Sequence, residues 1–170
     1  LKDLRGNINT RIAKLNAGEY DAIILAATGL QKLGIEGEVE HFNPINTDVM
    51  IPSMGQATLG IETTTDPKII EIVSVLNDKD AHIESTIERN FVDTLQGGCQ
   101  VPIGVKATII DEHSIRVQAI VGMPDGSEEI SEDITADIEE FETIGQNLAQ
   151  TFLDQGAKDL LERAEKVAFV

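Results

Sequence analysis

The fold of the C-terminal part of this chain is decided by one stretch of sequence, Ser114-Ile115-Arg116-Val117-Gln118-Ala119-Ile120-Val121. Apolar and polar residues nearly alternate along it, which predicts a β-strand that buries one of its faces. Similar stretches stand on both sides, at 105–109 and 129–134, and the residues that join them, 111–113 and 124–127, suit hairpin turns. The pattern therefore predicts a three-stranded antiparallel sheet.

Segments with helical spacing of apolar residues precede and follow these strands. A helix is predicted from about Asp78 to Leu95, because apolar residues recur there every fourth position. Two further helices, separated by Gly156, are predicted after the sheet. Their apolar positions are Ile138, Phe141, Ile144, Leu148 and Phe152 in the first, and Leu160, Leu161, Ala164 and Val167 in the second. Helices that cover a small antiparallel sheet make an α+β domain.

The N-terminal part has a different pattern, that of a βαβα-like fragment of an α/β domain. It predicts helices at 7–18, 28–33 and 67–76, and strands at 22–26 and 59–64. Ala22-Ile23-Ile24-Leu25-Ala26 is a continuous apolar run, as expected of a strand in a parallel sheet. Two strands are too few for such a sheet, so we expect this part to be a fragment of an α/β domain.

Composition and charge exclude several classes of protein. The net charge of −17 and the scarcity of aromatic residues argue against nucleic-acid binding. No apolar stretch is long enough to span a bilayer, and the three histidines are scattered without ligand spacing, so we expect neither a membrane protein nor a metal site. A single cysteine fits a reducing compartment, which predicts a cytoplasmic location. Residues 1–32 nevertheless carry five basic residues against three acidic ones, a small cationic region suited to an anionic ligand.

The single cysteine, Cys99, follows two glycines and closely precedes Pro102. The two glycines leave the backbone unrestricted and keep side-chain bulk away from the sulfur, so a large group could be attached there. The alternative is an inert loop cysteine.

Three segments resemble the porphobilinogen deaminase (hydroxymethylbilane synthase) family, and they follow one another along the chain in the same order as in that family. One is Gly97-Gly98-Cys99 with the nearby proline, which resembles the family's cofactor-attachment loop. Another is Leu4-Arg5-Gly6-Asn7-Ile8-Asn9-Thr10-Arg11, followed by residues 18–26, which resembles its substrate-gripping stretch. The third is Pro52-Ser53-Met54-Gly55-Gln56-Ala57-Thr58-Leu59-Gly60-Ile61-Glu62.

This resemblance implies a domain organisation, in which the N-terminal part belongs to two interleaved, doubly wound α/β domains. Residues 1–56 correspond to the second half of domain two, residues 57–77 to a strand and helix that return to domain one, and residues 78–170 to the C-terminal α+β domain that carries the cofactor cysteine. Close to half of the enzyme, its N-terminal portion, is then absent. The resemblance also implies tetrapyrrole biosynthesis: a transferase that polymerises porphobilinogen into hydroxymethylbilane with release of ammonia.

The resemblance assigns roles to individual residues. Cys99 is the attachment point of a dipyrromethane cofactor through a thioether, and Arg5 and Arg11 bind carboxylates of the cofactor and substrate. Weaker candidates for substrate binding are Lys32, Asn7 and Gln56. Of these, Lys32 stands where the family often has arginine. Asn7 could equally be a helix cap and Gln56 an ordinary linker residue.

Two further points follow from the family pattern. Ala57 stands where the family has a second glycine. The family's acid/base aspartate belongs to the absent portion, so no catalytic residue is expected in this chain, and the many acidic residues of 33–170 are interpreted as a solvated surface.

We therefore expect the chain to be inactive by itself and to lack the cofactor. Its expected partners are porphobilinogen, the growing pyrrole chain and the absent N-terminal portion, within a full-length enzyme that is a monomer. The alternative is a non-catalytic folded module with a free loop cysteine.

Overall fold

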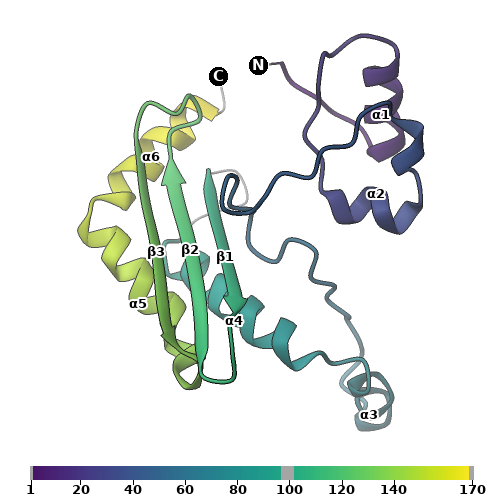
Figure 1. The fold of residues 1–170 in the computed structure, drawn as a ribbon. Helices are drawn as coiled ribbons and strands as arrows, with labels where there is room; N and C mark the ends of the chain where they lie inside the picture. Colours follow the sequence, from purple (N-terminus) through teal and green to yellow (C-terminus); the bar gives the residue numbers. More distant parts are fainter. Residues whose placement is uncertain (1, 97–101, 169–170) are drawn as a thin grey trace. The chain divides into compact units, whose positions relative to one another are not determined.

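The computed structural model describes residues 2–96 and 102–168. It divides into two compact units, Leu1–Asn46 and Thr47–Val170 (Figure 1). Each unit is described by itself below.

The second unit contains the antiparallel sheet that the sequence predicts. Its strands are β1 (Ile103–Ile109), β2 (Ser114–Gly122) and β3 (Glu129–Asp137), in the order β1-β2-β3. The register places Val117 opposite Ala107 on one side and Ile134 on the other. Both predicted turns are present, and each is closed by an aspartate that accepts a backbone hydrogen bond from two residues further on.

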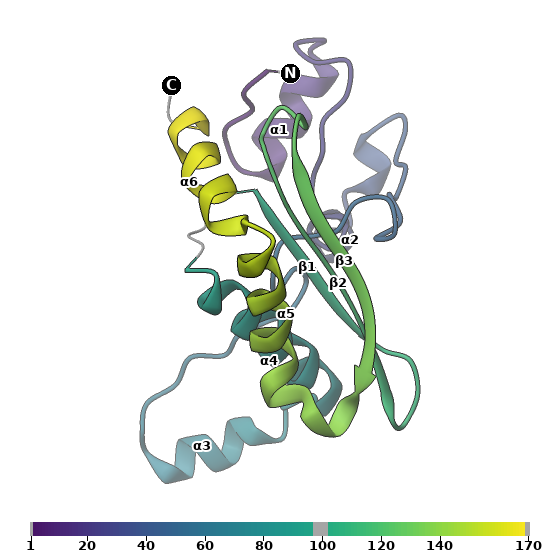
Figure 2. The same ribbon diagram turned by 90° about the vertical axis from the view of Figure 1, so that its left-hand side faces the viewer.

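Three helices cover one face of this sheet (Figure 2). They are α4 (Lys79–Thr94), α5 (Phe141–Asp154) and α6 (Ala157–Ala168), and a 3-10 turn, η2 (Ile138–Glu140), leads from β3 into α5. The prediction of an α+β domain is confirmed.

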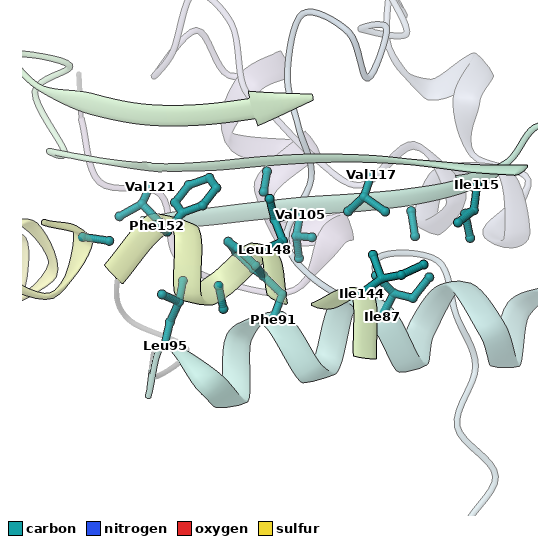
Figure 3. Packing of buried hydrophobic residues seen from close by; sticks show 14 of the residues in the cluster. Ile87, Phe91, Leu95, Val105, Ile115, Val117, Val121, Ile144, Leu148 and Phe152 are labelled. Atoms are coloured by element: carbon teal, nitrogen blue, oxygen red, sulfur yellow. The ribbon is translucent and has the colours of Figure 1, made fainter. Parts of the chain in front are cut away.

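The core lies between the helices and the sheet (Figure 3). Alternate residues of β2, which are Ile115, Val117, Ala119 and Val121, are fully buried there, as the period of two predicts. Phe91 of α4 and Phe152 of α5 meet edge to face with ring centroids 5.0 Å apart. Helices α4 and α5 approach closely at Gly145, where a Cβ atom would lie 2.2 Å from the carbonyl oxygen of Ile87.

The first unit contains two short helices and a 3-10 turn. These are α1 (Ile8–Asn16), α2 (Ala27–Leu33) and η1 (Glu36–Glu38). One apolar residue of each α-helix is buried, Ile12 and Leu30. Gly34 ends α2 in the left-handed conformation, with φ at +66°, as the sequence predicts.

Both predicted strands of the α/β part are wrong. Residues 22–26 and 59–64 are extended chain outside any sheet, and Ile24, Leu59 and Ile61 are more than half exposed. A strand needs a hydrogen-bonded neighbour, and the described residues supply none beside these two segments. The helix predicted between them and the C-terminal domain does form, as α3 (Pro67–Ser74), with Pro67 at its first position and no buried residue.

Candidate functional site

The cysteine loop connects two elements of the same core. Helix α4 is followed by Leu95, which is buried, and β1 begins at Ile103. Cys99 itself, with residues 97–101, lies outside the described residues. Its role therefore remains a prediction, although both ends of its loop are placed.

The first predicted substrate-binding stretch forms the N-terminus of α1. The Asn7 side chain accepts hydrogen bonds from the backbone nitrogen and the hydroxyl of Thr10, at 2.9 and 2.8 Å. Asn7 is thus the N-cap of α1, which is the structural role that the sequence left open. Gly6 precedes it with φ at +123°, and a Cβ atom there would lie 2.8 Å from Thr10 Cγ2. The turn into the helix therefore needs glycine at this position.

Two cationic side chains bond to the backbone of this turn. Arg11 Nε donates to the carbonyl oxygen of Gly6 at 2.8 Å, and Lys14 Nζ donates to the carbonyl oxygen of Arg5 at 3.2 Å. Arg11 is half-buried and Arg5 is exposed. Within residues 2–96 and 102–168, the two terminal guanidinium nitrogens of Arg11 have no hydrogen-bond partner. The structure therefore brings Arg5, Asn7 and Arg11 together, with donors of Arg11 available to an anion.

The remaining candidates lie elsewhere. Lys32 is exposed in the last turn of α2. Gln56 belongs to the second unit, in a turn where its backbone nitrogen donates to Ser53 and its side chain accepts from the Ser53 hydroxyl at 3.4 Å.

Ala57 adopts a left-handed backbone, with φ at +73°. This conformation costs a residue with a Cβ atom about 1 kcal/mol or more and costs glycine nothing. The backbone at this position is therefore one that glycine, the family's residue, would adopt without strain.

A buried carboxylate, Glu88 of α4, was interpreted from the sequence as solvated surface, and that interpretation is wrong. Glu88 is 4% exposed. Its Oε2 accepts from the backbone nitrogen of Gly55 at 2.7 Å, and its Oε1 accepts from the backbone nitrogen of Ala107 at 3.0 Å. Burial raises the pKa of Glu88, although the two backbone donors and the nearby Lys106 ammonium oppose that rise. The only signal in the sequence is that position 88 adjoins the apolar stripe of α4.

Glu88 belongs to a larger set of contacts between residues 47–56 and the sheet. The carbonyl oxygen of Pro52 accepts from the backbone nitrogen of Val105 at 2.8 Å. The carboxylate of Asp48 pairs with Arg116 at 2.8 Å and accepts from Gln118 at 3.1 Å. These contacts lie at β1 and on the side of β2 opposite to the helices, which explains why Gln118 is buried.

Comparisons with known proteins match two parts of the chain to two family models, whose boundary lies further along the chain than that between the compact units. Residues 1–71 match the family model described as porphobilinogen deaminase, dipyromethane cofactor binding domain, and residues 82–154 match its C-terminal domain. The chain belongs to the porphobilinogen deaminase family. The resemblance stated from the sequence is confirmed.

Several porphobilinogen deaminases are similar to this chain along nearly its whole length. That of Aliarcobacter butzleri is 85% identical over 99% of the chain. Those of Nitratiruptor sp. and Sulfurimonas denitrificans are 52% and 50% identical over 99% and 97% of it. The matched regions make up 54%, 54% and 53% of these three proteins, so the chain spans about half the length of the porphobilinogen deaminases it matches.

Two searches of the described residues gave negative results. Across 2–96 and 102–168, none of the helices combines the length and apolar character needed to cross a bilayer. In the same residues, no cluster of three or more His, Cys, Asp or Glu side chains could hold a metal ion.

Proposed function

We propose that this chain is the cofactor-bearing part of a hydroxymethylbilane synthase, which joins porphobilinogen units head to tail with release of ammonia. The observation that carries the proposal is the similarity to porphobilinogen deaminases over 99% of the chain. Its match to a cofactor-binding domain model supports a dipyrromethane cofactor.

Cys99 is the residue that would hold the cofactor, through a thioether. It is the single cysteine of the chain and stands between two glycines and Pro102. The cofactor supplies a permanently attached primer, so that each coupling takes place at a high effective concentration. The elements on both sides of the loop belong to the core: Leu95 before it is buried, and β1 begins after it.

Arg5 and Arg11 are proposed to bind the acetate and propionate groups of the pyrroles. A guanidinium stays charged at all working pH values and can donate two parallel hydrogen bonds to one carboxylate. The bond from Arg11 Nε to Gly6 orients the guanidinium and leaves its terminal nitrogens as donors. The chemistry of this cationic turn therefore suits a polycarboxylate, and Lys32, Asn7 and Gln56 are secondary candidates.

The acid/base group of the reaction is proposed to lie outside this chain. It would belong to the part of the whole enzyme that corresponds to the unmatched half of the relatives. The exposed apolar residues of α3, Ile69, Ile70 and Ile72, would then pack against that part. We expect the chain by itself to be inactive and without cofactor for the same reason. We also propose that the whole enzyme is a monomer and that it is cytoplasmic; the single cysteine of this chain fits a reducing compartment.

Intact-mass measurement of the whole enzyme tests the role of Cys99. The wild-type protein should be heavier than its polypeptide by one dipyrromethane, and Cys99→Ser should have the mass of the bare polypeptide. A wild-type enzyme that is active at the bare mass would refute the attachment.

Steady-state kinetics of the whole enzyme test the arginines. Arg11→Gln should raise the KM for porphobilinogen by about tenfold or more, because it removes a charged donor. The control is Lys158→Gln, which removes an exposed cation from α6. Equal KM values for Arg11→Gln and wild type would contradict the assignment.

A further inference from the structure

Glu88 connects three separate parts of the second unit. It lies on α4, and its two carboxylate oxygens accept from Gly55, 33 residues before it, and from Ala107, 19 residues after it. A buried carboxylate is costly unless its oxygens are bonded, and both oxygens of Glu88 are bonded. These bonds indicate a structural role, because they join the 47–56 segment to α4 and to β1.

The other contacts of the 47–56 segment involve its earlier residues, up to Pro52. Asp48 and Pro52 bond to β2 and β1, and the carbonyl oxygen of Ile51 lies 2.8 Å from where a Cβ atom on Gly104 would stand. After Pro52, the side chain of Glu88 makes the contact that holds the turn at Gly55 to the domain.

Glu84 offers an internal comparison one helical turn away. It also lies on α4, and it accepts from the backbone nitrogen of Ile109 at 3.1 Å and pairs with Lys106 at 3.8 Å. Glu84 therefore bonds to the same edge of β1 but not to the 47–56 segment.

We propose that Glu88 is a positioning residue, which holds the turn at Gly55, and with it Gln56, in the arrangement that substrate binding requires. The effect of Glu88 on the placement of this turn follows from its hydrogen bond to Gly55 and does not depend on the reaction. The consequence for substrate rests on the proposed function, so the two parts are tested separately.

Residue-resolved amide exchange of the whole enzyme tests the placement, whatever reaction the protein catalyses. In Glu88→Gln the amide of Gly55 should exchange at least about tenfold faster than in wild type, while buried amides of β2 keep their rates. In Glu84→Gln the Gly55 amide should not change. An unchanged Gly55 rate in Glu88→Gln, or equal acceleration in both variants, would overturn the proposal. If Glu88→Gln exposes the amides of β2 as well, Glu88→Asp, which keeps the charge on a shorter side chain, replaces it with the same expected result.

A double-mutant cycle tests the consequence for substrate. Glu88→Gln should raise the KM for porphobilinogen about fivefold with little change in kcat, as expected when one ordering hydrogen bond is lost. Combined with Gln56→Ala, its effect should be much smaller than the product of the two single effects, whereas Glu84→Gln should be without effect in either background. Independent effects of Glu88→Gln and Gln56→Ala would overturn this part. Failure of the proposed function would be distinguishable, because a wild-type enzyme without activity or adduct leaves the amide-exchange result intact.

Discussion

Replacing Gly145 by alanine tests the close contact between helices α4 and α5. The new Cβ atom would lie 2.2 Å from the carbonyl oxygen of Ile87 and 2.8 Å from the backbone nitrogen of Phe91. Both atoms are main chain of α4, so no side-chain rotation relieves the overlap, and α4 and α5 must separate by roughly 1 Å. Overpacking of this kind costs about 1–3 kcal/mol, and occasionally more. Alanine recovers about 1 kcal/mol through its higher helix propensity.

Because the obstacle is rigid, we expect the upper part of this range, a net loss of about 2 kcal/mol. For a chain of 170 residues this corresponds to a Tm lower by about 4–8 °C. Urea unfolding followed by circular dichroism measures the free energy, and Gln146→Ala, on the exposed side of the same helix, is the control, expected within about 0.5 kcal/mol of wild type. If Gly145→Ala were as stable as wild type or more stable, the close helix contact described here would be refuted.

Three further predictions concern other parts of the chain. Asn7→Ala should destabilise α1 by about 1 kcal/mol, seen as faster amide exchange in its first turn, and Asn7→Ser should restore most of the protection. Phe152→Ala should lower the free energy of unfolding by about 3–5 kcal/mol in urea, because it leaves a cavity beside Phe91; a loss below about 1 kcal/mol would contradict the packing. Hydrogen bonding to Arg116 lowers the pKa of Asp133, so this pair stabilises the fold above the ordinary aspartate pKa and loses that effect as the pH falls through the lowered value. Asp133→Asn should therefore weaken the dependence of Tm on pH below about 4, and an unchanged dependence would contradict it.

The sequence predicted the C-terminal domain well because its information is local. The period of two in β2 and the stripe of Ile83, Ile87 and Phe91 on α4 each identify one buried face, and the structure places these faces together. The two strands predicted at 22–26 and 59–64 were wrong because a local pattern, such as the apolar run at 22–26, does not report whether another strand lies beside it, and strand pairing depends on such a neighbour.

The candidate site was predictable only in part. Arg5 and Arg11 stand next to a helix start that the sequence marks clearly, and Arg11 bonds to the carbonyl oxygen of Gly6, the residue that follows Arg5. Glu88 was missed because its burial arises from a segment more than thirty residues away, and no local pattern reports such a contact. Arg116 and Gln118 alternate with apolar residues as an exposed face would, yet the 47–56 segment covers part of that face.

The hydrogen bonds along the outer edge of β1 have a consequence for association between molecules. An exposed edge strand can pair with the edge strand of another copy and begin aggregation. Three backbone donors of β1, those of Val105, Ala107 and Ile109, bond to Pro52, Glu88 and Glu84. The strand at the other edge of the sheet, β3, carries acidic residues along its length. At neutral pH, carboxylates therefore oppose pairing at both edges of the sheet. Glu84 and Glu88 occupy backbone donors of β1. The acidic residues of β3 repel the same strand of another copy. Protonation of these carboxylates at low pH weakens both effects, so acidification should favour self-association.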